Sequence, residues 1–432
     1  MGLRDLAATK AATTGQNGTE TTGPELNVIM VGGGGAMFGS TEGPWNLSAR
    51  LEHRLGPRLK VQGVIDPDPS RALAALEKKK TSLVKDSYEG TEVYPTIAVF
   101  AEAIKEGKVK TPDAAFVASP PVWRGSLEPG RDLEIQLIEA FPKIHIFLEK
   151  PVATAVPWDK SVSDAKTIAD RLAKHPGFVS IGYCLRYAKA ALEMKKILKE
   201  NNLRVMSTMA RYISAYELSP KSAWWDVTKL QGPIVEQATH ICDLSRHFGG
   251  DVIPETISAN ALEAYEEPAS NLSKISFDET EVPLKHRIPR ATAACWKYKS
   301  GAVGTVVHAL VLHGVDYAVE LEVYADGYQL ILQDPFGIPS LSIRKPGSDI
   351  PEVIQLTGDD PYQTEVDAFI DAIDGNGASR ILCDYADAAK TYEMTWYIRN
   401  SAEESSRRLR EMNGVTLPEP TAEELAFDAW SK

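Results

Sequence analysis

The chain of 432 residues is longer than one ordinary domain, and its 43% hydrophobic and 25% charged residues are typical of a globular protein. Its formal net charge of -12 argues against a nucleic-acid partner, because an acidic surface repels phosphate. No apolar run approaches the roughly 18 residues that cross a bilayer, so no membrane span is expected. We therefore expect two globular domains.

The cysteines and the N-terminus indicate a reducing, cytoplasmic location. The four cysteines are widely spaced, form no Cys-x-x-Cys pair and accompany no secretion signal. Residues 1–24 are rich in Thr, Gly and Ala and contain no apolar core, so they are interpreted as a flexible leader rather than a targeting peptide.

Residues 25–184 alternate apolar strands with helical stretches. This alternation is typical of right-handed βαβ units, so we expect a doubly wound parallel sheet that binds a dinucleotide, a Rossmann domain. The expected strands are 27–31, 59–65, 114–118, 143–148 and 178–183, and the expected helices are 70–80, 97–106 and 158–175.

Residues 185–432 show a different pattern, in which strands follow one another through short glycine-containing turns. We expect an α+β domain on a large, mostly antiparallel sheet, whose exposed face forms a homodimer or homotetramer. C-terminal helices 363–373 and 385–410 are expected to pack back on the first domain, and 263–289 is interpreted as a long insertion. The expected strands are 205–213, 291–298, 303–312, 317–324 and 328–332, and the covering helices are 192–201 and 235–248.

A glycine-rich turn, Gly32 to Gly39, follows the first expected strand. Glycine permits a tight turn and lets backbone N–H groups approach a pyrophosphate, and Gly33-x-Gly35 is the best candidate pair, with Ala36 and Met37 beside it. The spacing is longer than Gly-x-Gly-x-x-Gly, and Pro44 predicts that the next helix begins there. A glycine turn without a ligand is the alternative.

Asp66 ends the second expected strand. An acidic side chain at this position accepts hydrogen bonds from the adenosine ribose and repels a 2′-phosphate, which favours NAD over NADP. Alternatively, Asp66-Pro67-Asp68-Pro69 is only a turn and helix cap, and Asp68 is the more cap-like of the two acidic residues.

Glu149-Lys150-Pro151 places a lysine directly after the strand expected at 143–148. Ligands of open parallel sheets bind outside the carboxyl ends of the strands, so Lys150 is expected to face a cofactor. A solvated charge is the ordinary meaning of such a lysine. Glu149-Lys150-Pro151 indicates a functional site only in combination with the other motifs.

Glu236 and His240 lie four residues apart in the helix expected at 235–248, with Asp243 one turn further. Histidine suits proton transfer because its unperturbed pKa of about 6.5 is close to working pH. An ordinary surface pair and a metal site are the alternatives, and no metal-binding motif supports the latter.

Together these motifs resemble the glucose-fructose oxidoreductase/inositol dehydrogenase (Gfo/Idh/MocA) family of nicotinamide-dependent oxidoreductases. The resemblance implies that Lys150 hydrogen-bonds the reacting oxygen, that a cis peptide precedes Pro151, and that His240 is the general acid/base. Glu236 stands where the family commonly has aspartate and would assist His240. The resemblance covers about residues 27–412.

The resemblance also implies further contacts to the cofactor and substrate. Ser119 and Pro120 would run beneath the nicotinamide and ribose, although Trp123-Arg124 stands where the family often has a histidine. Glu149 is expected to orient the cofactor end of the site. The substrate pocket would be lined by Tyr183 and Arg186, and Trp225 is a candidate for stacking on a sugar.

The predicted function is NAD(P)-dependent interconversion of a secondary alcohol and a ketone on a sugar, polyol or related cyclic molecule. A nicotinamide-binding sensor without turnover is one alternative. An enzyme that keeps NAD bound and uses transient oxidation for elimination or glycoside cleavage is the other.

Overall fold

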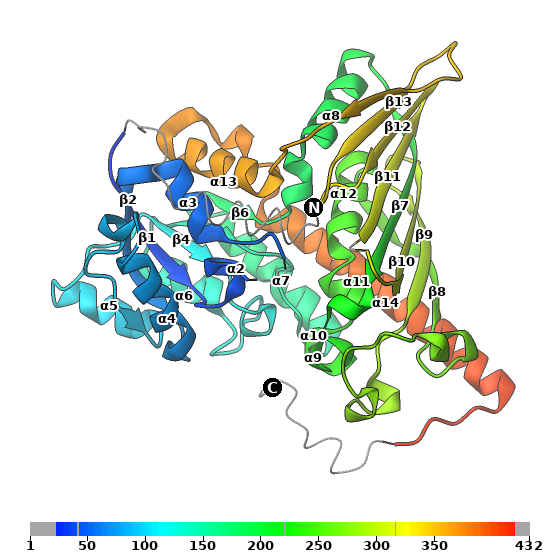
Figure 1. Ribbon diagram of the computed structural model, residues 1–432, viewed down its shortest axis with the longest axis horizontal. Helices are drawn as coiled ribbons and strands as arrows, with labels where there is room; N and C mark the ends of the chain where they lie inside the picture. The colour runs from blue at the N-terminus through cyan, green and yellow to red at the C-terminus, as the bar shows by residue number, and fades with distance from the viewer. Residues whose placement is uncertain (1–22, 41–42, 220–221, 316, 420–432) are drawn as a thin grey trace. The chain divides into compact units, whose positions relative to one another are not determined.

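The computed structural model describes residues 23–40, 43–219, 222–315 and 317–419 (Figure 1). The predicted leader lies outside the described residues except for its last two. The chain divides into two compact units, of which the first extends to Tyr187 and also includes Asp360–Ala389. The second contains Ala188–Asp359 and continues from Lys390. The prediction named one second domain, 185–432, with C-terminal helices packing back on the first; in the structure Asp360–Ala389, which includes the predicted helix 363–373, belongs to the first unit.

The first unit contains a six-stranded parallel sheet in the order β3-β2-β1-β4-β5-β6. This confirms the predicted doubly wound Rossmann sheet. The sequence pattern missed β3, which has only two residues and therefore no periodicity. The strands are β1 (Leu26–Val31), β2 (Leu59–Ile65), β3 (Val93–Tyr94), β4 (Ala114–Val117), β5 (His145–Leu148) and β6 (Val179–Ile181).

The helices of the first unit correct one prediction, that a helix begins at Pro44. The helix α3 begins at Leu47, because the Asn46 side chain caps it by accepting the N–H of Ala49 at 3.1 Å. A one-turn helix, α2, comes directly after the glycine turn. The helices are α2 (Gly35–Phe38), α3 (Leu47–Leu55), α4 (Pro69–Lys80), α5 (Ile97–Lys105), α6 (Leu133–Ala140), α7 (Trp158–Leu172) and α13 (Pro361–Asp371).

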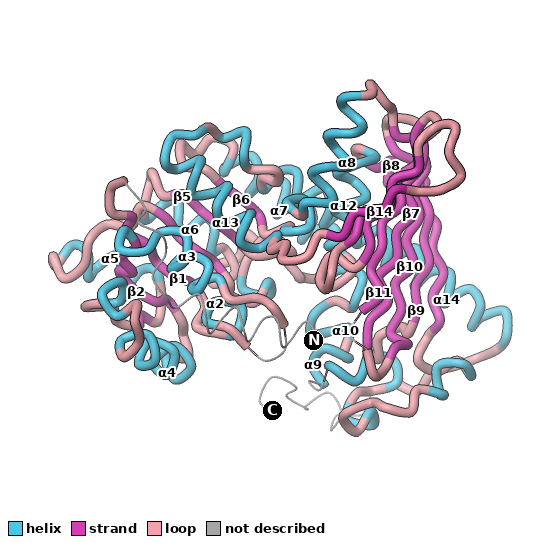
Figure 2. The backbone as a smooth tube through the Cα atoms, turned by 45° about the horizontal axis from the view of Figure 1, so that its top comes forward, coloured by secondary structure: helices cyan, strands magenta, loops and turns pink. Residues whose placement is uncertain are grey.

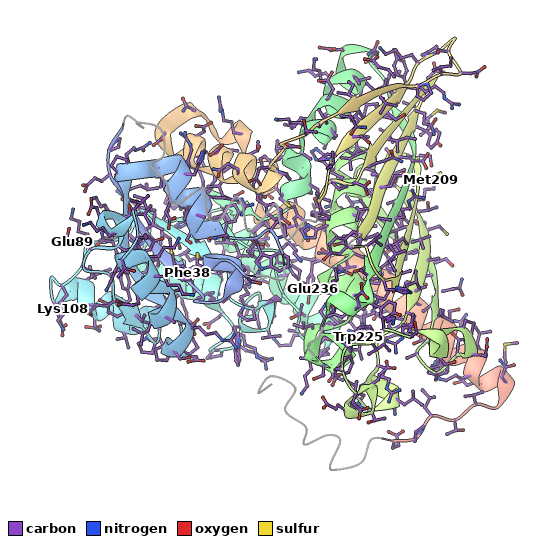
Figure 3. The ribbon with its side chains drawn as sticks, viewed as in Figure 1. Phe38, Glu89, Lys108, Met209, Trp225 and Glu236 are labelled. Atoms are coloured by element: carbon purple, nitrogen blue, oxygen red, sulfur yellow. The ribbon has the colours of Figure 1, made fainter. Side chains whose placement is uncertain are left out.

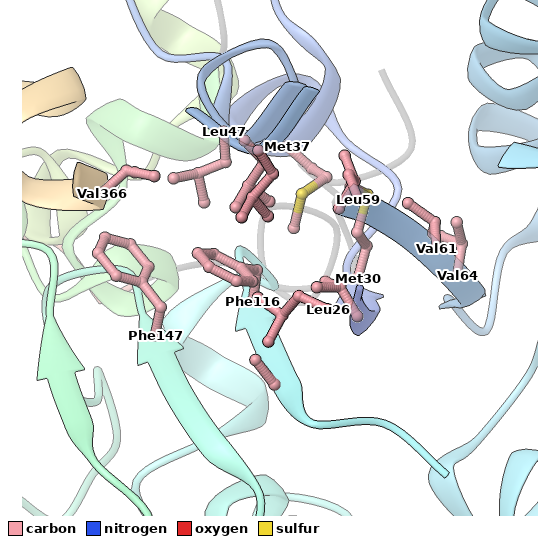
Figure 4. Close-up of a cluster of buried hydrophobic side chains, with 14 of the residues drawn as sticks. Leu26, Met30, Met37, Leu47, Leu59, Val61, Val64, Phe116, Phe147 and Val366 are labelled. Carbon is pink, nitrogen blue, oxygen red and sulfur yellow. The ribbon is translucent and has the colours of Figure 1, made fainter. Parts of the chain in front are cut away.

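The first hydrophobic core lies between the parallel sheet and the helices α3 and α13 (Figure 4). Phe116 and Phe147, from the neighbouring strands β4 and β5, stack with ring centroids 5.5 Å apart. Phe369 of α13 meets them edge-on at 5.5 and 5.7 Å, and Val366 is also buried there. The C-terminal segment thus completes a core built mainly by the N-terminal half of the chain.

The second unit contains an eight-stranded sheet in the order β14-β13-β12-β11-β7-β10-β9-β8. Only β7 and β10 pair in parallel, which confirms the mostly antiparallel sheet. Gly301 and Gly327 take positive φ in the predicted hairpin turns. The strands are β7 (Val205–Ala215), β8 (Val252–Leu262), β9 (Ala291–Tyr298), β10 (Val303–Leu312), β11 (Tyr317–Ala325), β12 (Tyr328–Gln333), β13 (Ser340–Arg344) and β14 (Glu352–Gln355).

Helices cover one face of this sheet, as Figures 1 and 2 show for α8 and α12. The helix α12 packs against β7, β10 and β11, and the side chains of β7 accordingly alternate between buried Tyr212 and exposed Arg211. The helices are α8 (Lys189–Glu200), α9 (Ser222–Trp225), α10 (Val227–Leu230), α11 (Pro233–Glu236), α12 (Thr239–Gly249) and α14 (Tyr385–Asn413), which starts within the first unit.

The long insertion 263–289 is an ordered part of the second unit. It contains short 3-10 helices at Glu267–Asn271, Glu279–Glu281 and Leu284–His286. Val282 and Ile288 are buried in a small core with Tyr216, Trp225 and Leu310. The insertion therefore covers part of the unit rather than extending freely.

Candidate functional site

The predicted cofactor residues of the first unit lie at one edge of the parallel sheet. The strands β2, β1, β4 and β5 are neighbours in this order, and the predicted residues follow their carboxyl ends. Since parallel strands end at the same edge, the structure brings these segments together where open sheets bind ligands. They are Asp66 after β2, Gly33 and Gly35 after β1, Ser119 and Pro120 after β4, and Glu149 and Lys150 after β5.

The glycines of the turn differ in their surroundings. Gly32 has a φ of +95°, and a Cβ there would lie 2.7 Å from the Ser119 nitrogen, so this position requires glycine. A Cβ on Gly33 would lie 2.7 Å from the Ala72 Cβ, whereas a Cβ on Gly34 would meet nothing within 4 Å. The prediction missed Gly32, because its role depends on β4, far along the chain.

The predicted neighbours of these glycines have different environments. Ala36 is half-buried at the start of α2. The Met37 side chain is fully buried in the first core, packed with the residues of Figure 4. The Met37 side chain therefore packs in the core, and a contact of its backbone with the cofactor stays a prediction.

Asp66 ties the glycine turn to the end of β2. Its Oδ2 accepts the N–H of Gly33 at 2.6 Å, and its Oδ1 accepts the N–H of Asp68 at 2.9 Å. Asp68 instead caps α4, accepting the N–H of Ser70 at 3.0 Å. The two acidic residues therefore have separate tasks: one orients the turn and the other begins the helix.

Replacing Asp66 by Ser should weaken NADH binding by roughly tenfold, because hydrogen bonds to a charged carboxylate contribute about 1.5 kcal/mol or more. Discrimination against NADPH should fall at the same time, since the repelling charge is lost. Fluorescence titration of both nucleotides measures this. Asp68→Ser is the matched control and should leave both affinities unchanged; an equal loss there would attribute the effect to the stability of α4.

Ser119 and Arg124 shape the loop after β4. The Ser119 hydroxyl oxygen is buried and has no hydrogen-bond partner among the described residues, so a cofactor hydroxyl or amide would satisfy it. The Arg124 side chain is 1% exposed and donates from Nε to the Ser119 carbonyl oxygen at 3.2 Å. Together with the glycine turn and Asp66, this loop fits a bound dinucleotide.

Glu149 and Lys150 are half-buried at the end of β5, and the Lys150–Pro151 peptide bond is cis, as the family resemblance implied. Burial raises the pKa of the Glu149 carboxyl, and the charges of Lys150, Arg124 and Arg50 partly offset this. A Cβ on Gly182 would lie 3.0 Å from Glu149 Oε2, so glycine there leaves room for the carboxylate.

The predicted substrate residues Tyr183 and Arg186 follow β6 and are buried. Arg186 donates from Nη1 to the Leu382 carbonyl at 2.6 Å and to Asp387 Oδ2 at 2.5 Å. Its guanidinium thus joins the Asp360–Ala389 segment to the N-terminal part of the first unit. A role in substrate binding for either residue stays a prediction.

In the second unit, the structure contradicts a single helix through Glu236 and His240. The helix α11 ends at Glu236 and α12 begins at Thr239, and the His240 N–H donates to the Gln237 carbonyl at 3.4 Å. Between the two helices, the Gln237 side chain reaches the sheet, where its Nε2 donates to Ser214 Oγ at 3.3 Å. Glu236 and His240 therefore belong to two short helices separated by two residues.

His308 of β10 holds the other end of the Gln237 amide. Its Nε2 lies 2.7 Å from Gln237 Oε1, and since the amide nitrogen is directed to Ser214, the imidazole is the donor. The ring is fully buried, stacks on Tyr212 with centroids 5.8 Å apart, and burial lowers its pKa to about 3. His308 is therefore neutral at working pH.

Replacing His308 by Leu should make the second unit less sensitive to acid. A histidine with a lowered folded-state pKa destabilises the fold as pH falls from about 6.5 towards about 3, by about 1.4 kcal/mol per pH unit, because the unfolded chain binds the proton. Between pH 7 and 5 the wild type should lose about 2 kcal/mol more than His308→Leu in urea unfolding. The control His53→Leu, at an exposed histidine, should lose as much stability between pH 7 and 5 as the wild type. An equal loss in the wild type, His308→Leu and His53→Leu would contradict the prediction.

His240 is 8% exposed and lies against an aromatic cluster. The Phe336 ring meets its imidazole edge-on at 5.6 Å, and Phe336 also contacts Tyr212 and Tyr317 at 6.0 and 6.2 Å. Phe336 lies in the turn between β12 and β13, so no sequence pattern connected it with His240. Among the described residues no group of three His, Cys, Asp or Glu side chains is placed to hold a metal ion.

The structure contradicts the prediction that Trp225 stacks on a sugar. Its indole is fully buried in the small core under the insertion, its Nε1 donates to the Ser219 carbonyl at 2.8 Å, and Arg290 lies over its ring. The half-buried neighbour, Trp224, instead directs its Nε1 to Glu236 Oε2 at 3.5 Å.

The parallel sheet and the glycine turn at its carboxyl edge are those of a Rossmann nucleotide-binding domain, and a second α+β unit follows it. Comparison with known proteins gives the family: residues 26–183 match the model of the oxidoreductase family with an NAD-binding Rossmann fold, and 186–328 match an oxidoreductase C-terminal domain. The chain belongs to the Gfo/Idh/MocA oxidoreductase family.

Curated relatives include two uncharacterised proteins of Schizosaccharomyces pombe, C12C2.04 and UNK4.17. Each is 41% identical, over 87% of this chain and 97% of the relative for the first, and over 88% and 92% for the second.

Solved structures with the same fold include levoglucosan dehydrogenase in complex with NADH and levoglucosan, with 18% identity and a TM-score of 0.62 over 88% of this chain and 98% of that one. UDP-N-acetylglucosamine 3-dehydrogenase GnnA from Acidithiobacillus ferrooxidans has 13% identity and a TM-score of 0.61 over the same shares. None of the described helices combines the length and apolar character of a membrane span.

Proposed function

We propose that this oxidoreductase interconverts a secondary alcohol and a ketone on a sugar, polyol or related cyclic molecule. The observation that carries the proposal is Lys150, a half-buried ammonium group directly after β5, beside the loops that form the dinucleotide site. The solved structures named above support a carbohydrate substrate, because those proteins are named as dehydrogenases of levoglucosan and UDP-N-acetylglucosamine.

Each side chain has a stated task in this proposal. Bound NAD supplies the hydride acceptor. The Lys150 ammonium hydrogen-bonds the substrate oxygen and stabilises negative charge that develops there, while the His240 imidazole accepts the hydroxyl proton. Glu236 supports the histidine from the end of α11. The proposal requires that the two units bring Lys150 and His240 to the same hydroxyl group.

A panel of cyclic sugars, inositols and linear polyols, each mixed with NAD, tests the proposed function by NADH absorbance. We expect turnover with at least one cyclic compound. A sensor would bind NADH, and the bound nucleotide would quench the tryptophan fluorescence of the protein. The sensor would oxidise no compound of the panel. An enzyme that recycles bound NAD would form product without net NADH, which chromatography of the sugars would detect.

We expect a homodimer or homotetramer through the uncovered face of the eight-stranded sheet, in a cytoplasmic protein. Met209 on β7 is 47% exposed on the side away from α12 (Figure 3). By the strand register, Val303 and Val307 on β10 lie on the same face, and they are 50% and 42% exposed. Cys295 of β9 pairs with Thr305 on this face and is also exposed. Such an apolar surface is typical of an interface between subunits.

Replacing Met209 by Glu should convert the oligomer to a monomer at micromolar concentration, because a carboxylate would be buried without a partner in the interface. Light scattering after gel filtration gives the mass directly. Leu73→Glu is the control, since Leu73 is 54% exposed on α4 of the first unit. An unchanged mass for Met209→Glu would contradict an interface on this face.

A further inference from the structure

Arg124 links the two loops that surround the proposed catalytic lysine. Its Nη1 donates to the Pro151 carbonyl at 2.6 Å and to the Val152 carbonyl at 3.4 Å, while its Nε donates to the Ser119 carbonyl at 3.2 Å. One guanidinium group therefore bridges the segment after β4 and the segment after β5. The planar fork of arginine makes this possible, because its donors are fixed relative to one another.

Burying the charged Arg124 guanidinium costs free energy, and neighbouring polar groups offset part of that cost. Burial lowers the pKa of Arg124, and the largest opposing influence is the charge of the Glu134 carboxyl, which is itself fully buried. Glu134 Oε2 accepts the N–H of Gly125 at 3.0 Å, and its Oε1 accepts the Tyr385 hydroxyl at 3.4 Å. The Arg124 guanidinium is thus buried and donates its hydrogen bonds to protein carbonyl groups instead of to water.

A second, independent observation, at Gly125, shows that the loop after β4 packs closely against the loop after β5. Its φ is +73°, and a Cβ at this position would lie 2.5 Å from the Val152 carbonyl oxygen and 2.4 Å from the Ala153 Cβ. The backbone after Arg124 thus touches the same segment that the guanidinium binds. Any side chain at 125 would push the Pro151–Ala153 segment away.

We propose that Arg124 is a positioning residue, which fixes the direction of Lys150 relative to the Ser119 side of the cofactor site. The bond to the Pro151 carbonyl holds the residue that follows Lys150, and the bond to the Ser119 carbonyl holds the loop expected under the nicotinamide. This inference deepens the proposed function and rests on it. Without Arg124, the two loops would keep their folds but lose their common anchor.

The test compares Arg124→Lys and Arg124→Ala with the control Arg58→Lys. A lysine ammonium is a single point and cannot span both loops. Arg58 is comparably buried, at 5% exposure, but binds Asp374 and the Pro24 carbonyl in another part of the first unit. Loss of stability common to buried arginines therefore appears in Arg58→Lys as well.

With the compound that the wild type oxidises fastest, Arg124→Lys should lower kcat by roughly 10²-fold, the effect of a misplacement of about 1 Å. The dissociation constant of NADH should change by less than about threefold, because the glycine turn and Asp66 remain. Ethylguanidinium should restore part of kcat in Arg124→Ala and none in Lys150→Met. An unchanged kcat in Arg124→Lys, or a loss without rescue that Arg58→Lys matches, would overturn the assignment.

Hydrogen exchange separates failure of this inference from failure of the proposed function. In the NADH-bound protein, the backbone amides of the segment 150–154 should exchange at least about fivefold faster in Arg124→Lys than in the wild type. Their exchange rate in Arg58→Lys should equal that of the wild type. This readout needs no substrate. If the wild type oxidises nothing in the panel, the proposed function fails while the exchange result still decides the role of Arg124; equal exchange in both variants rejects it.

Discussion

Replacing Lys150 by Met should lower kcat by roughly 10³-fold, with little change in the affinity for NADH. Methionine keeps the length and apolar stem of lysine but removes the ammonium group, so no donor remains to stabilise charge on the substrate oxygen. The proposed nucleotide contacts of the glycine turn and Asp66 would remain, because these residues follow the neighbouring strands β1 and β2 and bond each other independently of Lys150. Steady-state kinetics and fluorescence titration measure the two effects separately.

Lys143→Met provides the matched control for this variant. Lys143 is exposed and precedes β5, so it lies at the opposite end of the same strand from Lys150. The control should retain wild-type kcat and NADH affinity. Turnover that survives in Lys150→Met would exclude the lysine from the chemistry, and a parallel loss of NADH affinity would assign it to cofactor binding alone.

Replacing His240 by Asn should lower kcat by roughly 10²- to 10³-fold, because the proton acceptor is lost while a polar side chain of similar shape remains. The wild-type rate of alcohol oxidation should fall as pH is lowered, since a protonated imidazole cannot accept a proton. The variant should lack this dependence. Rates measured across the acid range test both statements.

His247→Asn is the control for His240, because His247 lies on the same helix, α12, two turns later. It should retain the rate and the acid dependence of the wild type. A normal acid dependence in His240→Asn would show that another group accepts the proton. A loss of rate shared by both variants would show that substitution in α12 affects the fold instead.

The sequence predicted the parallel sheet because buried strands leave a strong local signal. The predicted strand 59–65 matches β2 residue for residue, and β4 differs from 114–118 by one position. Such strands are apolar on both faces and are bounded by loops, so composition alone marks them. The loops at their carboxyl ends then follow from topology, which is why the sequence predicted that Asp66 follows β2 and that Lys150 follows β5.

Features that depend on distant contacts could not be predicted. Between Glu236 and His240, Gln237 forms a hydrogen bond with His308, which lies 71 residues away in the chain, and no local pattern reveals that contact. The burial of Trp225 requires the insertion that covers it, and Met37 is buried by the core of its own unit. Arg124 was noted only as a departure from the family, because its carbonyl partners are visible only in the folded chain.

A crystal structure of Lys150→Met with NAD and the best sugar substrate tests most directly whether the two units act on one hydroxyl group. The inactive variant should trap substrate with one hydroxyl oxygen about 3 Å from the His240 imidazole. The position 150 side chain should point to the same oxygen. Side chains 150 and 240 directed into different cavities, or a sugar bound away from the nicotinamide, would contradict the proposed dehydrogenase.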